Sequence, residues 1–158
     1  MNDSLGSKTR RGWLWSFAPL FLWIGVIFYL SSSSGSMTET SRFVRPLLEF
    51  LFPSATEDVL LNYHFYIRKL AHITEYAVLG FLAMRAFLGT ASPFAIASII
   101  VVLVAAADEF NQSFQSSRTS SAGDVLLDCI GGMLAIGIYL TTRWYFPKPA
   151  ETSLPSTP

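Results

Sequence analysis

The feature that most limits the fold of this chain is an apolar run without charge at residues 13–30, WLWSFAPLFLWIGVIFYL. A helix of this length is about 27 Å long, close to the thickness of the hydrocarbon core of a bilayer. Lys8, Arg10 and Arg11 precede the run, an arrangement also found in secretory signal peptides. The apolar core of a signal peptide is usually shorter, about 7–15 residues, and the serines at 31–34 form a poor cleavage site. We therefore predict a retained transmembrane helix.

Three later apolar stretches predict three more membrane-spanning helices. We place the four spans at residues 13–30, 70–88, 93–108 and 124–142. The turn between the second and third spans ends at Pro93, and proline fits the first turn of a helix because its missing N–H needs no partner there. Residues 13–142 are predicted to form one membrane domain.

The segments outside the spans are polar or mixed in character. Residues 1–12 are predicted to be a cytoplasmic segment, and residues 143–158, which contain four prolines, a disordered cytoplasmic tail. In the first outer loop, apolar residues recur at helical spacing over residues 42–52, which predicts a helix that lies in the membrane interface or caps the bundle. The predicted fold class is an all-α membrane protein: a bundle of about four transmembrane helices with an interfacial helix in the first outer loop.

The composition favours the lipid bilayer as the main partner of the chain. Apolar residues make up 51% of the 158 residues, and charged residues 14%. The formal net charge is zero, so no basic field indicates a nucleic-acid partner. The single cysteine, Cys129, excludes an intrachain disulfide and a multi-cysteine zinc site. Its position in an apolar stretch favours a buried side chain over a reactive thiol.

The distribution of Lys and Arg favours a cytoplasmic location for both termini. One side of the membrane would hold the amino terminus and Lys8, Arg10, Arg11, Arg85, Arg143 and Lys148. The opposite, outer side would hold Arg42, Arg45, Arg68, Lys69 and Arg118. The first set lies closer to the span ends, so the positive-inside rule assigns it to the cytoplasm.

Ionisable residues interrupt the second span at helical spacing. Arg68, His72 and Glu75 are separated by four and then three residues, and Lys69, His72 and Tyr76 by three and then four. Residues at these spacings project from one broad face of a helix. Glu75 lies inside the span, where an unpartnered charge costs about 3 kcal/mol, so its carboxylate is expected to have a partner or a water-filled cavity.

A second polar set surrounds the connection between the third and fourth spans: Asp108, Glu109, Gln112, Arg118, Asp124 and Asp128. Antiparallel packing would bring this set to the same membrane surface as the charged start of the second span. The topology therefore predicts one shared polar pocket. Asp128 favours a functional pocket most, because it lies one turn inside an apolar helix. Asp124 follows Ser121 by three residues and has a simpler alternative, a capping box at the start of the fourth helix.

The motifs resemble the VanZ-like family of bacterial membrane proteins over about residues 20–142. The pattern consists of Lys69-x-x-His72-x-x-Glu75-Tyr76, then Asp108-Glu109-x-x-Gln112, then Arg118 and Asp124-x-x-x-Asp128-x-x-Gly131. The resemblance implies a multi-pass protein of the bacterial plasma membrane with four spans. The family is named for a member linked to low-level teicoplanin resistance, so it also implies an effect on glycopeptide susceptibility.

The leading functional hypothesis is a pocket at the outer surface that binds or modifies an amphiphilic, anionic envelope molecule, such as a lipid-linked intermediate. Arginine suits phosphate and carboxylate groups, and histidine or glutamate can act as a general base. The candidate catalytic residues are His72, Glu75, Asp108, Glu109 and Asp128. The candidate substrate-binding residues are Arg68, Lys69, Tyr76, Gln112, Arg118 and Asp124.

Two alternatives stay open. The first is a metal-dependent hydrolase or transferase, because bundle cores build metal sites from carboxylates and histidines. Its potential ligands are His72, Glu75, Asp108, Glu109 and Asp128. The cluster has only one histidine, since His64 is expected at the membrane interface, so we predict no metal site and no cofactor. The second is a non-enzymatic scaffold or partner-binding protein whose buried charges only lock the helix bundle. Enzymatic activity and oligomeric state are both left open.

Overall fold

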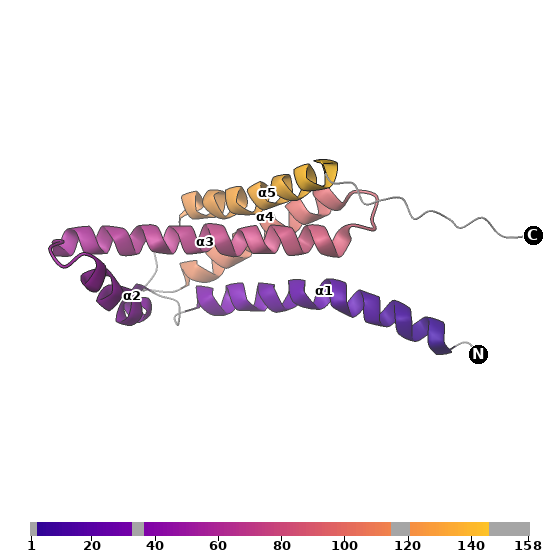
Figure 1. Cartoon of the computed structure of the whole chain (residues 1–158), viewed down its shortest axis with the longest axis horizontal. Helices are drawn as coiled ribbons and strands as arrows, with labels where there is room; N and C mark the ends of the chain where they lie inside the picture. The colour runs from indigo at the N-terminus through magenta and orange to yellow at the C-terminus, as the bar shows by residue number, and fades with distance from the viewer. Residues whose placement is uncertain (1–2, 33–36, 115–120, 146–158) are drawn as a thin grey trace, which may run out of the picture.

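The computed structural model describes residues 3–32, 37–114 and 121–145, and within these ranges the chain forms five helices (Figure 1). They are α1 (Asp3–Ser31), α2 (Met37–Leu51), α3 (Glu57–Phe87), α4 (Pro93–Ser113) and α5 (Ala122–Tyr145). No strand occurs in these described ranges, so the predicted all-α fold class is confirmed. The short helix expected in the first loop is α2, which begins before residue 42.

The long helix α3 lies at the centre of the bundle. It contacts each of the other four helices, and α4 also contacts α1 and α5. Figure 1 shows that the long helices alternate in direction. The end of α1, the start of α3, the end of α4 and the start of α5 therefore lie at one end of the bundle. The polar residues 68–76 of α3, 108–112 of α4 and 124–128 of α5 lie toward this end.

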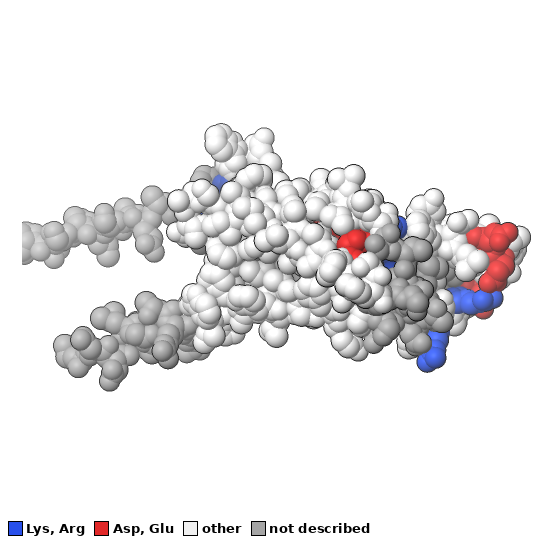
Figure 2. All heavy atoms as spheres, turned by 180° about the vertical axis from the view of Figure 1, so that it is seen from behind, with Lys and Arg blue, Asp and Glu red and all other residues white. Residues whose placement is uncertain are grey.

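Three of the described helices are long and apolar enough to cross a membrane: Gly12–Ser31, Pro93–Ser113 and Ala122–Tyr145. In their most apolar windows only 17%, 33% and 22% of the residues are buried inside the chain. Most of these apolar residues therefore face outward, as expected for a multi-pass membrane protein surrounded by lipid. On the face seen in Figure 2, the charged side chains lie mainly at the end formed by α2 and the start of α3, and most of the other described atoms in view belong to uncharged residues.

Helix α3 is not among these three candidate spans, and its predicted span contains His72, Glu75 and Arg85. Its crossing at residues 70–88 stays a prediction, supported by its central position. The other helices pack against α3, and His72, Glu75 and Arg85 are each only partly exposed. The helices also extend past the predicted span ends: α1 begins at Asp3, α4 continues to Ser113 and α5 to Tyr145. The predicted tail beyond residue 145 lies outside the described residues.

Pro19 inside α1 leaves a backbone carbonyl that Arg85 of α3 binds. Pro19 has no N–H, so the carbonyl of Trp15, four residues earlier, lacks its helical hydrogen bond. The Arg85 guanidinium donates a hydrogen bond of 3.0 Å to this carbonyl oxygen. Beside it, the rings of Phe17 and Phe87 meet edge to face, with centroids 5.2 Å apart. Arg85 therefore satisfies a backbone group of α1 and ties α1 to α3.

Glycines allow the backbones of α3 and α5 to touch. A Cβ atom added to Gly80 would lie 2.5 Å from the carbonyl oxygen of Gly132, and one added to Gly131 would collide with the carbonyl oxygen of Ile73. Both clashes involve backbone atoms, which cannot rotate away as a side chain could. Small residues at such positions are typical of helix contacts in membranes. The two helices can approach this closely only with glycine at these positions.

We expect Gly131→Ala to destabilise the protein by about 1–3 kcal/mol, the usual cost of overpacking, because α5 would have to move away from α3. Thermal unfolding in detergent or nanodiscs measures this effect. Gly137→Ala on the same helix is the matched control. A Cβ atom there meets nothing within 4 Å, and alanine is the better helix former by up to about 1 kcal/mol. Equal melting temperatures for the two variants would contradict the close contact.

Candidate functional site

Three ionisable side chains from three helices meet at the polar end of the bundle. His72 belongs to α3, Asp108 to α4 and Asp128 to α5, and the two aspartates are only 1% and 2% exposed. His72 Nδ1 lies 3.5 Å from Asp128 Oδ1. One potential ligand atom from each residue lies within 4.8 Å of those of the other two. These three residues form what we call the His–Asp–Asp centre.

Hydrogen bonds hold Asp108 through one of its two carboxylate oxygens. The Tyr76 hydroxyl donates to Asp108 Oδ2 over 3.3 Å, and Gln112 Nε2 donates to the same oxygen over 3.2 Å. Gln112 Nε2 also donates to Ser31 Oγ over 3.0 Å. Gln112 and Ser31 are themselves 3% exposed. This chain of bonds fixes the orientation of Asp108 and connects α4 to α1 and α3.

Three buried atoms of the centre have no hydrogen-bond partner among the described residues: His72 Nδ1, Asp108 Oδ1 and Asp128 Oδ1. Leaving a buried polar group unsatisfied costs about 1–3 kcal/mol, and more for a charged group. Two neighbouring carboxylates in a low-dielectric interior also repel each other. The centre is therefore suited to hold a positive species, either a proton or a cation.

The Lys69 side chain is not part of the His–Asp–Asp centre and contacts Asp124 instead. Its ammonium group forms an ion pair with Asp124 at the start of α5, and both side chains are 25% exposed. Glu109 accepts a hydrogen bond from the backbone N–H of Ser121, and the Ser121 hydroxyl accepts one from the N–H of Gly123 over 3.1 Å. In a capping box, Asp124 would have bonded the Ser121 N–H. Glu109 has this role instead, so the capping-box alternative for Asp124 is wrong.

A pocket of about 190 Å³ opens between α1, α2 and α3. Its apolar lining comes from all three helices: Leu30, Val44, Ile67 and Ala71. Its polar lining consists of Thr40, His64, Arg68, His72 and Glu75. Arg68 forms no salt bridge with any carboxylate of the described residues. His72 belongs both to this lining and to the His–Asp–Asp centre, so the two sites adjoin.

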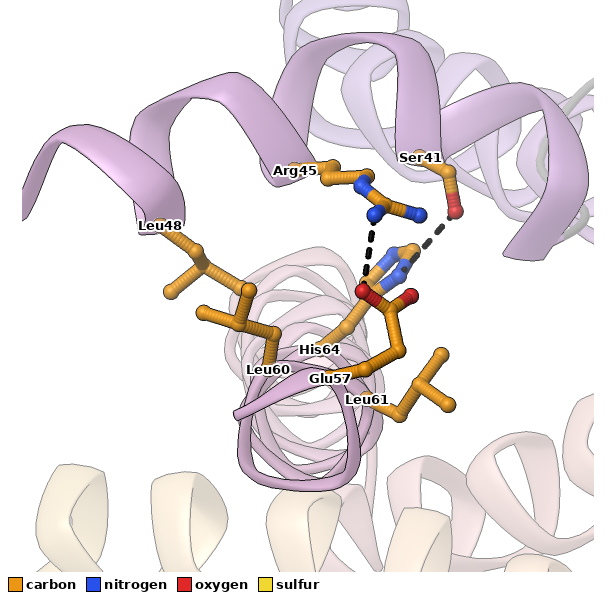
Figure 3. Close-up of a pocket in the computed structure, with 7 residues that line it drawn as sticks. All are labelled: Ser41, Arg45, Leu48, Glu57, Leu60, Leu61 and His64. Atoms are coloured by element: carbon orange, nitrogen blue, oxygen red, sulfur yellow. Dashed lines mark hydrogen bonds and ion pairs between the residues drawn. The ribbon is translucent and has the colours of Figure 1, made fainter. Parts of the chain in front are cut away.

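Helix α2 is fixed to α3 beside this pocket (Figure 3). His64 lies between two hydroxyl groups, with Thr40 Oγ1 3.2 Å from Nε2 and Ser41 Oγ 3.3 Å from Nδ1. Arg45 pairs with Glu57 across the two helices over 2.7 Å. Ser41, Arg45, Glu57 and His64 also line a second, much smaller pocket of about 30 Å³, which is the pocket drawn in Figure 3. His64 is only 5% exposed because α2 packs over it. Its expected position at the membrane interface stays a prediction.

The predicted polar residues thus occupy three neighbouring environments. The His–Asp–Asp centre and its hydrogen-bond partners contain His72, Tyr76, Asp108, Gln112 and Asp128. Two structural contacts use Lys69, Asp124 and Glu109. Arg68 and Glu75 line the open pocket with His72. Arg118, predicted to bind substrate, lies outside the described residues.

Several site residues were missed because their types carry no strong signal in the sequence. Ser31 looked like the start of a serine-rich loop, although it ends α1 and accepts a hydrogen bond from Gln112. Trp23 looked like any apolar residue of a span, although its Nε1 donates to the backbone oxygen of Glu75 over 2.9 Å. Only its indole N–H, which needs an acceptor when buried, could have indicated such a contact. Thr40 and Val44 line the pocket only because α2 folds back on α3.

Comparison with known protein families gives one match. The model of the family described as VanZ/LLP1 matches residues 16–143, which include most of α1 and α5 and all of α2, α3 and α4. The resemblance recognised in the motifs is therefore confirmed. No curated protein and no solved structure gives a significant match to the chain.

The surroundings of His64 predict a pH dependence outside the spans. Burial lowers the pKa of His64 below its ordinary value of 6.5, and the positive charge of Arg68 lowers the pKa further. Because the unfolded chain then binds the proton more readily, the contribution of His64 to stability is present above about pH 6.5 and is lost as the pH falls through the pKa of the folded state. Histidine NMR of the protein in detergent should give a pKa below 6.5.

Arg68→Gln should raise the pKa of His64, because it removes one of the two causes of the shift. Arg143→Gln at the far end of α5 is the charge-matched control and should leave the pKa unchanged. A His64 pKa at or above 6.5 in the wild type would contradict the packing of α2 on α3 described above.

Proposed function

The chain belongs to the VanZ/LLP1 family, and from this premise we propose that it binds an amphiphilic, anionic molecule of the bacterial cell envelope in the pocket between α1, α2 and α3. The observation that carries the proposal is Arg68, which lines a largely apolar pocket without forming a salt bridge to any described carboxylate. A partly buried guanidinium in such surroundings favours an anion as its partner. Phosphate and carboxylate groups match its planar set of donors.

The size of the pocket limits how such a molecule would bind. A volume of about 190 Å³ is smaller than the roughly 300–1,000 Å³ of pockets that enclose a whole drug-sized ligand. The pocket therefore suits a head group rather than a complete lipid. The acyl or prenyl chain would lie along the outward-facing apolar side chains of the bundle.

Arg68 and Glu75 would contact different parts of the head group. They are seven residues apart on α3, which corresponds to about 10 Å along the helix axis. With the polar end of the bundle at the outer membrane surface and both termini in the cytoplasm, Arg68 lies nearer the water and Glu75 deeper. A phosphate would bind Arg68, and a hydroxyl group could reach Glu75 or His72. These two residues are also the candidates for a general base if the molecule is modified after binding.

This function also accounts for the link to antibiotics that the family resemblance implies. A protein that binds or alters a lipid-linked envelope intermediate changes the material from which the cell wall is built. We include altered susceptibility to glycopeptide antibiotics in the proposal for this reason.

Binding can be measured with the full chain in phosphatidylcholine nanodiscs and a polyprenyl phosphate as the anionic probe. We expect Arg68→Gln to weaken binding about tenfold or more, because a hydrogen bond to a charged group contributes about 1.5–3 kcal/mol. Arg68→Lys should restore part of the affinity. Arg143→Gln removes the same charge at the other end of the bundle and should leave binding unchanged. Wild-type affinity in Arg68→Gln would overturn the proposed function.

A scaffold whose charges only lock the bundle is the second candidate, and the Lys69–Asp124 ion pair favours it. Lys69→Met should lower the melting temperature in both cases, because it leaves Asp124 without its partner. The two candidates differ in what happens at Arg68. For a scaffold, Arg68→Gln changes neither probe binding nor glycopeptide susceptibility, whereas the proposed function requires both to change while the protein stays folded and abundant.

A further inference from the structure

We propose that the His–Asp–Asp centre is a binding site for one divalent transition-metal ion, held by His72, Asp108 and Asp128. This inference does not depend on the proposed binding of an envelope molecule, because it concerns the buried centre and can be tested with the metal alone.

The positions of the three residues meet the first requirement of a metal site. Zinc lies about 2.0–2.2 Å from histidine nitrogen and carboxylate oxygen, so two ligand atoms of one tetrahedral ion are about 3.4 Å apart. The potential ligand atoms here lie within 4.8 Å of one another, and His72 Nδ1 and Asp128 Oδ1 are 3.5 Å apart. The His72–Asp128 pair already has this spacing, and the most widely separated pair would have to close by at most about 1.4 Å through side-chain rotation.

The burial and pairing of the two aspartates are an independent observation. Each side chain is almost completely buried, and each has one carboxylate oxygen without a hydrogen-bond partner among the described residues. A divalent cation would satisfy both oxygens and neutralise both negative charges. It would also bind His72 Nδ1, which makes no hydrogen bond and lies 3.5 Å from Asp128 Oδ1, and so replace a proton shared by these two atoms.

The hydrogen bonds around Asp108 are those expected of a metal ligand. Tyr76 and Gln112 both donate to Oδ2, while Oδ1 is left unpaired. Bonds of this kind orient a coordinating carboxylate and raise the affinity of a site for its metal. Ser31 in turn accepts from Gln112, so α1 supports the site indirectly.

The chemistry of the ligands indicates which ion would bind. One imidazole nitrogen and two carboxylates suit Mn²⁺, Fe²⁺ or Zn²⁺, whereas calcium sites in proteins use oxygen ligands. Three protein ligands leave at least one coordination position for water or another molecule. His72 also lines the neighbouring pocket, so the ion would lie at its inner wall. Glu75 would then be the remaining candidate for a general base.

The sequence left a metal site open as an alternative, with potential ligands that include His72, Asp108 and Asp128, but the single histidine of the cluster led us to predict none. The structure instead brings one residue from each of three helices together, with both aspartates buried.

The test uses the full chain, purified without chelator in phosphatidylcholine nanodiscs, stripped with EDTA and then titrated with Mn²⁺. Bound Mn²⁺ is measured as the loss of the EPR signal of the free ion, and Zn²⁺ is added as a competitor. We expect one Mn²⁺ per chain, displaced by Zn²⁺, and a melting temperature that rises with metal. Asp128→Asn and Asp108→Asn should abolish saturable binding.

Tyr76→Phe keeps all three ligands but removes a hydrogen bond to Asp108, so it should weaken Mn²⁺ binding about tenfold. It keeps the test decisive if the aspartate variants do not fold. Asp58→Asn, at an exposed position in the first turn of α3, is the matched control and should bind like the wild type. A wild type that binds neither ion, an Asp128→Asn variant that binds like the wild type, or an unchanged affinity in Tyr76→Phe would each overturn the proposal.

Discussion

The contact between the backbones of α3 and α5 determines the geometry of the candidate site. Gly131 lies against the carbonyl group of Ile73. Asp128 precedes Gly131 by nearly one turn of α5, and His72 directly precedes Ile73 on α3. The distance between the imidazole and the carboxylate is therefore set by a contact without side chains. A larger residue at Gly131 would separate the two helices and the two polar groups together.

Much of the architecture could be predicted because membrane helices are encoded by simple local patterns. Uninterrupted apolar runs predicted α1, α4 and α5, and the spacing of His72, Glu75 and Tyr76 predicted the polar face of α3. Antiparallel packing then predicted that Asp108 and Asp128 lie at the same end of the bundle. These inferences need only the length of a span, the helical period and short connections.

The hydrogen-bond or ion-pair partner of each polar side chain could not be predicted, because the sequence offers several possible partners for the same group. Ser121 and Asp124 have the spacing of a capping box. In the structure, however, the Asp124 carboxylate pairs with Lys69, and the Ser121 backbone N–H donates to Glu109. The choice depends on how closely α3 and α4 approach the start of α5, which no local pattern contains. His64 is similar: its burial depends on where α2 folds back.

The glycine contact between α3 and α5 forms only after the last described helix has been synthesised. Translation proceeds from the amino terminus, so α3 is synthesised before α4 and α5 exist. During that interval His72 lacks both aspartates, and Lys69 lacks Asp124. The last helix therefore completes the polar interior, and an α5 that cannot approach α3 leaves ionisable groups in an apolar environment.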